Sequence, residues 1–195
     1  MIEQTGLINT LCKILREDPA VKALFLKGSL ARNEADKHSD VDFYCLVTEE
    51  AKEEFLNKRK NYLGRYRPLL FWVEVNHVAP QIVAVYDNGL HLDFYTVTKS
   101  TLLQTDSIKV LYDPENLLIN YKEEDLNMTP DKVIKAFESF VFLLLEFEVA
   151  YKRNDLLLAS RLAGHLSGEL ALLIRFIYDN KKSQLGFKRL YKYLD

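Results

Sequence analysis

The sequence predicts an α+β fold, in which a mixed-sheet domain is followed by a C-terminal bundle of helices. Short apolar or alternating runs dominate the chain up to residue 112, which is typical of strands. After residue 128 the apolar residues recur at helical spacing over long stretches. The 195 residues are 48% hydrophobic, enough to build a substantial core. We therefore expect two domains, 1–125 and 129–195.

The first elements alternate between helix and strand. Leucine and isoleucine residues on one helical face predict a helix over 3–17, which Asp18-Pro19 ends. Apolar runs predict strands at 21–27 and 41–47, joined by a turn or short helix and a loop over 30–38.

The middle of the chain continues this pattern. Thr48 is a suitable cap for a helix extending to about Asn61, in which acidic residues precede basic ones. Strands are expected at 69–75, 81–86 and 90–98, with a shorter one near 110–112. Asn88-Gly89 between two alternating runs indicates a hairpin.

The C-terminal part reads as helices. Thr129-Pro130 combines a capping residue with proline at the first helical position, so a helix should run from there to about Lys152. Further helices are expected at about 156–180 and 186–193. The longest unbroken apolar run, residues 140–145, is too short to span a membrane.

Two aspartates open the second expected strand. Residues i and i+2 of a strand point to the same face, so Asp40 and Asp42 should stand side by side. Adjacent carboxylates repel each other unless a cation lies between them. Oxygen ligands favour a hard ion, so the pair predicts a Mg²⁺ site.

A phosphate-binding turn is predicted directly after the first strand. Gly28 allows a sharp bend and close approach of the backbone to a ligand. The Ser29 hydroxyl and exposed N–H groups there can hold phosphate oxygens, and Arg32 can neutralise their charge. Together with the aspartates, these residues predict a metal–triphosphate site.

These segments resemble the signature of the nucleotidyltransferase superfamily (DNA polymerase beta-like), Gly-Ser followed by Asp-x-Asp. The chain is most similar to the antibiotic (aminoglycoside or lincosamide) nucleotidyltransferases and their minimal relatives. The match is specific over residues 21–47 and looser to about residue 98. Asn33 stands where these relatives often have glycine, and asparagine tolerates left-handed backbone geometry.

The resemblance also implies a third carboxylate on a strand beside Asp-x-Asp. Asp93 lies midway along the expected strand 90–98 and is the residue for this position, either as a third metal ligand or as a general base. Asp40, Asp42 and Asp93 are thus the expected catalytic residues.

The resemblance implies Mg²⁺-dependent transfer of a nucleoside monophosphate from an NTP, expected to be ATP, to a hydroxyl of a small molecule such as an antibiotic. An alternative is a minimal nucleotidyltransferase antitoxin that modifies or binds a partner protein. Glu146, Glu148 and Arg161 lie in the helical part and are interpreted as an acceptor pocket. An ion-paired helix surface is the competing interpretation of these charges.

Composition limits the possible partners. The formal net charge is −2, so a nucleic-acid substrate is not expected. Cys12 and Cys45 lie in apolar patterns and are expected to be reduced core thiols. With no signal peptide evident, we expect a cytoplasmic protein without a membrane segment. The apolar helix around 137–147 is also suited to forming a homodimer.

Overall fold

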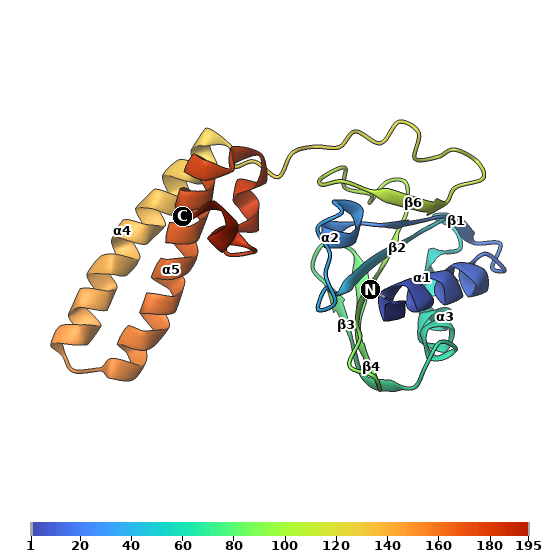
Figure 1. The fold of residues 1–195 in the computed structure, drawn as a ribbon, viewed down its shortest axis with the longest axis horizontal. Coiled ribbons are helices and arrows are strands. Elements are labelled where there is room, and N and C mark those ends of the chain that lie inside the picture. The colour runs from blue at the N-terminus through green and yellow to red at the C-terminus, as the bar shows by residue number, and fades with distance from the viewer. Residues whose placement is uncertain (1, 195) are drawn as a thin grey trace. The chain divides into compact units, whose positions relative to one another are not determined.

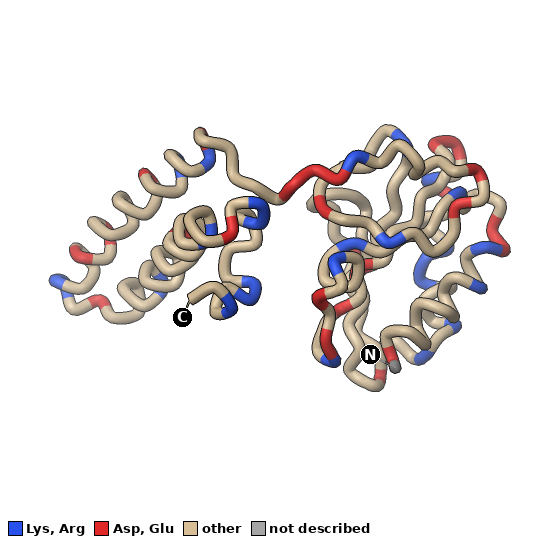
Figure 2. Tube along the Cα trace, turned by 45° about the horizontal axis from the view of Figure 1, so that its top comes forward, with Lys and Arg blue, Asp and Glu red and all other residues tan. Residues whose placement is uncertain are grey.

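A computed structural model describes residues 2–194 and divides the chain into two compact units, Met1–Glu124 and Asp125–Asp195. The first unit is a sheet with helices and the second is helical (Figure 1). The expected α+β class is confirmed. Acidic residues are concentrated where the chain leaves the first unit, at Glu123, Glu124 and Asp125 (Figure 2).

The first unit contains one six-stranded mixed sheet. Its strands are β1 (Val21–Leu26), β2 (Val41–Val47), β3 (Leu69–Asn76), β4 (Pro80–Tyr86), β5 (His91–Val97) and β6 (Lys109–Tyr112). Its helices are α1 (Ile2–Leu15), the short α2 (Gly28–Ala31) and α3 (Lys52–Gly64).

The strand order is β3-β4-β5-β2-β1-β6. β2 and β5 run parallel, and the other neighbouring strands are antiparallel. The parallel pair sets Asp42 opposite Asp93 in register, although the two residues are far apart in sequence. This pairing brings two of the sequence-predicted carboxylates to the same level of the sheet.

Helices α1 and α3 pack against one face of this sheet. Leu7 and Leu11 of α1 and Phe55 of α3 contribute to a buried cluster with strand residues such as Phe43 and Phe94. The opposite face carries Asp42, Tyr44, Asp93 and Tyr95, because these alternate along β2 and β5 with the residues that join this cluster, such as Phe43 and Phe94. Part of this second face is covered by the segment that follows β5, including Leu102, Ile108 and Leu118.

The second unit is a helical hairpin. α4 (Pro130–Lys152) begins as expected, with the Thr129 hydroxyl accepting a hydrogen bond from the Lys132 N–H. α5 (Leu156–Tyr178) is capped by Asp155, which accepts from the Leu158 N–H. Two 3₁₀ segments follow, η1 (Asn180–Leu185) and η2 (Leu190–Tyr193).

Two expected elements differ from the structure. The helix expected from Thr48 begins at Lys52, because the Thr48 hydroxyl instead caps a preceding turn by accepting from the Ala51 N–H. Of the final helix expected over 186–193, only the last four residues are helical, as the 3₁₀ segment η2. Gly186 has a φ of +52°, which breaks a helix, and the chain forms the two 3₁₀ segments on either side.

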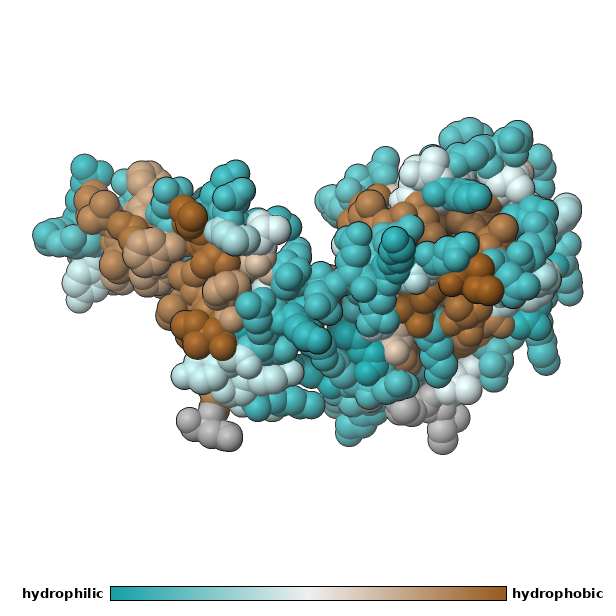
Figure 3. Space-filling view, turned by 90° about the horizontal axis from the view of Figure 1, so that it is seen from above, coloured by the Kyte–Doolittle hydropathy of each residue, from teal (hydrophilic) through white to brown (hydrophobic). Residues whose placement is uncertain are grey.

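The helical hairpin leaves much apolar surface uncovered within its own unit. Phe142 of α4 and Leu157 of α5 are 63% and 88% exposed, and hydrophobic residues lie at the surface of this unit in Figure 3. α5 is long and apolar enough, by length and composition alone, to cross a membrane. The longest unbroken apolar run does not reveal this property, because polar residues such as His165 interrupt α5.

Candidate metal and nucleotide site

Three carboxylates converge at one end of the central strands. Asp40 precedes β2, Asp42 lies on β2 and Asp93 lies on β5. One carboxylate oxygen from each lies within 4.8 Å of the others. Asp40 is exposed, while Asp42 and Asp93 are partly buried. These three hard oxygen donors lie near the ends of two central strands, where Asp40 reaches solvent. They fit a divalent cation such as Mg²⁺.

Gly28 brings the backbone directly against this cluster. Its φ is +67°, and a Cβ added there would lie 2.0 Å from Asp42 Oδ2. The preceding Lys27 N–H donates to the Asp42 carbonyl oxygen over 3.1 Å, which fixes the end of β1 beside β2. Only glycine therefore fits between the end of β1 and the Asp42 carboxylate.

The Ser29 hydroxyl is unsatisfied within the described part of the chain. Its Oγ is buried and has no hydrogen-bond partner among residues 2–194. A buried hydroxyl without a partner is costly, so a ligand atom, an ion or a water is expected to complete its hydrogen bonding. Its position next to Gly28 suits a phosphate oxygen. Asn33, farther along this turn, has a φ of +56°, in line with the left-handed geometry that asparagine tolerates.

Stacked rings support the strands that carry the carboxylates. Tyr44 and Tyr95 stack with ring centroids 4.3 Å apart, and Phe25 stacks on Tyr44 at 5.1 Å. Burial and, to a smaller extent, the negative charges of Asp93 and Asp42 raise the pKa of Tyr95 to about 12. The part of this shift that comes from the carboxylates reflects the negative charge of the triad, which favours cations.

Lys27 ties the segment after β5 to the site. Its ammonium donates to the carbonyl oxygens of Leu103 at 2.7 Å and Thr105 at 3.0 Å. It also lies over the rings of Tyr44 and Tyr121. Burial lowers the pKa of Lys27 to about 8, opposed in part by Asp106.

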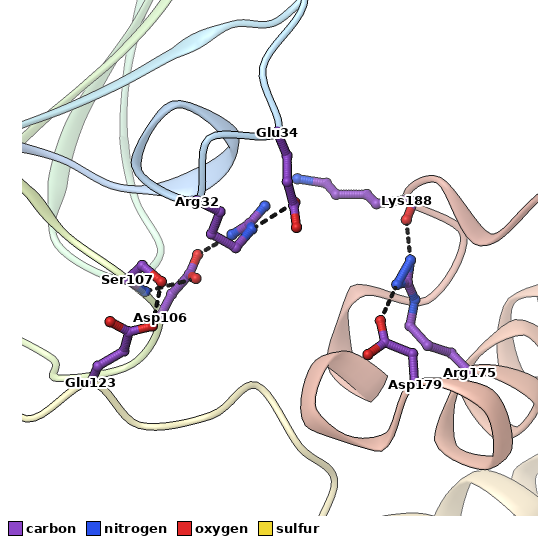
Figure 4. A network of polar contacts seen from close by, with 8 residues as sticks. All are labelled: Arg32, Glu34, Asp106, Ser107, Glu123, Arg175, Asp179 and Lys188. Carbon is purple, nitrogen blue, oxygen red and sulfur yellow. Dashed lines mark hydrogen bonds and ion pairs between the residues drawn. The ribbon is translucent and has the colours of Figure 1, made fainter. Parts of the chain in front are cut away.

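Arg32 is held by carboxylates of the protein. Its guanidinium pairs with Glu34 at 3.0 Å and with Asp106, and its side chain is 10% exposed (Figure 4). Asp106 adopts a φ of +68°, and its carboxylate also accepts from the Ser107 N–H. Arg32 thus anchors the 103–107 segment to the turn after Gly28-Ser29.

One buried polar contact was missed by sequence reasoning. Gln81 of β4 is 6% exposed, and its Nε2 donates to Asp93 Oδ1 over 2.8 Å. The signal in the sequence is a glutamine that opens the otherwise apolar run Ile82 to Val85. Its partner depends on the register between β4 and β5, which the sequence does not reveal.

The charged residues expected in the helical part do not form a cluster with one another. Glu146, Glu148 and Arg161 are all exposed. Glu148 pairs with Lys152 one helical turn away, and among residues 2–194 no ion pair joins Arg161 to either glutamate. The nearby Glu169 accepts from the Ser139 hydroxyl, which links α5 to α4.

Comparison with known proteins identifies the domain that carries the triad. No curated protein matches the chain. A family model described as "Nucleotidyltransferase domain" matches residues 8–153, about three quarters of the chain. The matched span includes the Gly28-Ser29 turn, all three aspartates and the whole of α4. The chain therefore belongs to the nucleotidyltransferase domain family.

Proposed function

We propose that this protein transfers a nucleoside monophosphate from an NTP, taken to be ATP, to a hydroxyl group of a small molecule. The observation that carries the proposal is the convergence of Asp40, Asp42 and Asp93 beside the Gly28-Ser29 turn. The orphaned hydroxyl of Ser29 adds a donor where the phosphates of an NTP would lie.

Asp40, Asp42 and Asp93 are assigned to hold Mg²⁺, which would neutralise the triphosphate and the charge that develops during transfer. Gly28 and Ser29 are assigned to the β- and γ-phosphates. Arg32 is assigned a supporting role at the phosphates through the turn that it anchors, because its own charge is already paired with Glu34 and Asp106.

In the proposed reaction, the oxygen of the acceptor hydroxyl forms a bond to the α-phosphorus. The bond from the α-phosphorus to the bridging oxygen breaks, and pyrophosphate leaves with that electron pair. A carboxylate takes the proton of the hydroxyl, and the residues proposed for this step are Asp93 and Glu146. Glu146→Gln separates them, because Glu146 lies outside the triad: if it is the base, its loss removes the acidic limb of the pH–rate profile while metal binding persists.

The acceptor class proposed first is a hydroxyl-bearing antibiotic, an aminoglycoside or a lincosamide. This proposal rests on the resemblance of residues 21–47 to the antibiotic nucleotidyltransferases. Glu146, Glu148 and Arg161 are proposed as acceptor contacts because they are exposed charges on the helical unit. We propose in addition that the protein acts as a soluble enzyme in the cytoplasm.

The decisive experiment measures pyrophosphate release with Mg²⁺, each of the four NTPs and a panel of such antibiotics. Wild type should release pyrophosphate only with an acceptor present, and mass spectrometry should find the acceptor heavier by one nucleoside monophosphate. Asp42→Asn should abolish release without unfolding. Glu54→Gln is the matched control, because Glu54 pairs with Lys58 on α3, which packs against the opposite face of the sheet from the triad. Equal activity of Asp42→Asn and wild type would contradict the proposal.

A second candidate function is modification or binding of a partner protein, as in minimal nucleotidyltransferase antitoxins. The exposed apolar residues of α4 and α5, such as Phe142 and Leu157, favour it because they suit a protein surface. Transfer of the nucleotide to a co-expressed protein, with none to the antibiotic panel, would select this alternative.

A further inference from the structure

Gln81 occupies a special position on the face of the sheet that carries the triad. It pairs in register with Tyr95, while Val83 pairs with Asp93. Gln81 is therefore a diagonal neighbour of Asp93 across the antiparallel β4–β5 pair, a separation that long side chains can span. Glutamine reaches this carboxylate from the next strand, whereas asparagine is one methylene shorter.

The contact has a defined direction. A carboxylate is an acceptor only, so the amide must present its NH₂ group to Asp93 Oδ1. A hydrogen bond of 2.8 Å at this oxygen fixes the rotation of the carboxylate about its Cβ–Cγ bond. That rotation sets the direction of both Asp93 oxygens. The ligand atom that Asp93 offers to a metal is thus oriented by a residue of β4.

The environment makes this hydrogen bond effective. Gln81 is 6% exposed, so little water competes for its amide. Its side chain carries no charge, so it orients Asp93 without adding repulsion, as a glutamate would, and without neutralising the triad, as a lysine would. A neutral buried donor therefore preserves the negative charge of the cluster.

We propose that Gln81 is a positioning residue for the metal centre, holding the Asp93 carboxylate in the orientation that completes the triad with Asp40 and Asp42. This inference rests on the proposed function, because it assumes that the triad binds a divalent cation. Groups that orient metal ligands contribute to metal affinity about 10–100-fold in other proteins.

The test measures binding of Mn²⁺ alone to the full chain, by the loss of the electron paramagnetic resonance signal of free Mn²⁺. Gln81→Met, which keeps the length of the side chain but removes the donor, should raise the Kd by about tenfold or more. Gln81→Asn retains an amide that is too short and should weaken binding similarly. At saturating Mg²⁺, pyrophosphate release by Gln81→Met should recover toward the wild-type rate, since the defect lies in metal binding.

Tyr86→Phe provides a matched control. Tyr86 lies on the same strand, is buried, and donates a hydrogen bond to the Leu63 carbonyl oxygen on the opposite face of the sheet. Its loss should lower the Tm while leaving the Kd for Mn²⁺ within about twofold, because the orientation of the metal ligands is unchanged. A merely structural role of Gln81 would give the same result as Tyr86→Phe.

Unchanged Mn²⁺ affinity in folded Gln81→Met and Gln81→Asn would overturn the inference and leave the metal centre intact. Asp93→Asn distinguishes a failure of the role proposed for Gln81 from a failure of the metal assignment itself. If wild type binds no Mn²⁺, or Asp93→Asn binds as tightly as wild type, the assignment of Asp93 to the metal fails and the role of Gln81 fails with it.

Discussion

Gly28 and Asp42 lie so close together that a single methyl group at Gly28 would overlap the Asp42 carboxylate, with 2.0 Å from the added Cβ to Oδ2. The φ of +67° at Gly28 adds a second reason for glycine. The bend after β1 and the strand that carries Asp42 thus form one steric unit.

Gly28→Ala should therefore remove activity and Mn²⁺ binding, because Asp42 must move. The left-handed backbone alone should lower the free energy of unfolding by about 1–2 kcal/mol. Gly89→Ala is the control, since Gly89 has a φ of +79° but open space around an added Cβ. It should lose similar stability in urea titrations and keep its activity. Full activity in Gly28→Ala would contradict this account.

Ser29→Ala should weaken substrate binding without weakening the fold. The Ser29 hydroxyl is buried and has no partner among residues 2–194, so its removal should leave the free energy of unfolding unchanged or raise it by up to about 1 kcal/mol. The KM for the NTP should rise about tenfold, the effect of one lost hydrogen bond to a charged phosphate.

Ser183→Ala is the contrasting control, because the buried Ser183 hydroxyl accepts from the Met128 N–H. It should lower the stability of the helical unit by about 1–3 kcal/mol and leave the KM unchanged. A loss of stability in Ser29→Ala would show that its hydroxyl has a protein partner after all.

Tyr62 should make stability depend on alkaline pH. Its hydroxyl donates to Asp18 over 2.6 Å, and burial followed by this contact raises its pKa to about 12. In the unfolded chain a tyrosine has a pKa of about 10. The stabilisation is thus fully present below about pH 10 and is lost as the pH rises toward 12.

The difference in unfolding free energy between wild type and Tyr62→Phe should shrink by about 1 kcal/mol from pH 9 to pH 11. Taking this difference cancels the titration of the other tyrosines. Urea unfolding followed by circular dichroism at both pH values measures it, and a difference that stays constant would refute the assignment.

Arg175 should be the most sensitive position of the helical unit. Its guanidinium is 1% exposed and donates to the carbonyl oxygens of Gly186 and Lys188 and to Asp179. Arg175→Met leaves these acceptors without a donor and should cost about 3–5 kcal/mol. Arg161→Met, on the exposed surface of the same helix, should cost less than about 0.5 kcal/mol. Hydrogen exchange over 180–190 should accelerate only in the first variant.

The sequence predicted those features that depend on local pattern. The bounds of β2 and the start of α4 agree with expectation, because apolar runs and the Thr129-Pro130 cap are local signals. The start of α3 was misplaced by three residues, from a cap at Thr48 to a cap at Ala51, since Thr48 caps a turn that is equally compatible with its sequence. The 3₁₀ segments after Asp179 depend on contacts to Arg175, which no local pattern reveals.

The same distinction applies to the candidate site. Asp40 and Asp42 are neighbours by strand periodicity alone, whereas Asp93 entered through resemblance to a family. Its place beside Asp42 depends on parallel pairing of β2 with β5. Gln81 and the pairing of Arg32 with Asp106 depend on register and tertiary packing, and these contacts join residues distant in the sequence. The roles of all these residues stay predictions.

The outermost strand β3 has a practical consequence for handling the protein. Leu70 is 73% and Phe71 54% exposed, and Glu74 is the only charged residue of the strand. An edge of this kind offers unpaired backbone groups and apolar side chains to any other extended chain. Concentrated samples should form β-rich aggregates through residues 69–75, and Leu70→Lys should raise the solubility limit by placing a charge on this exposed edge.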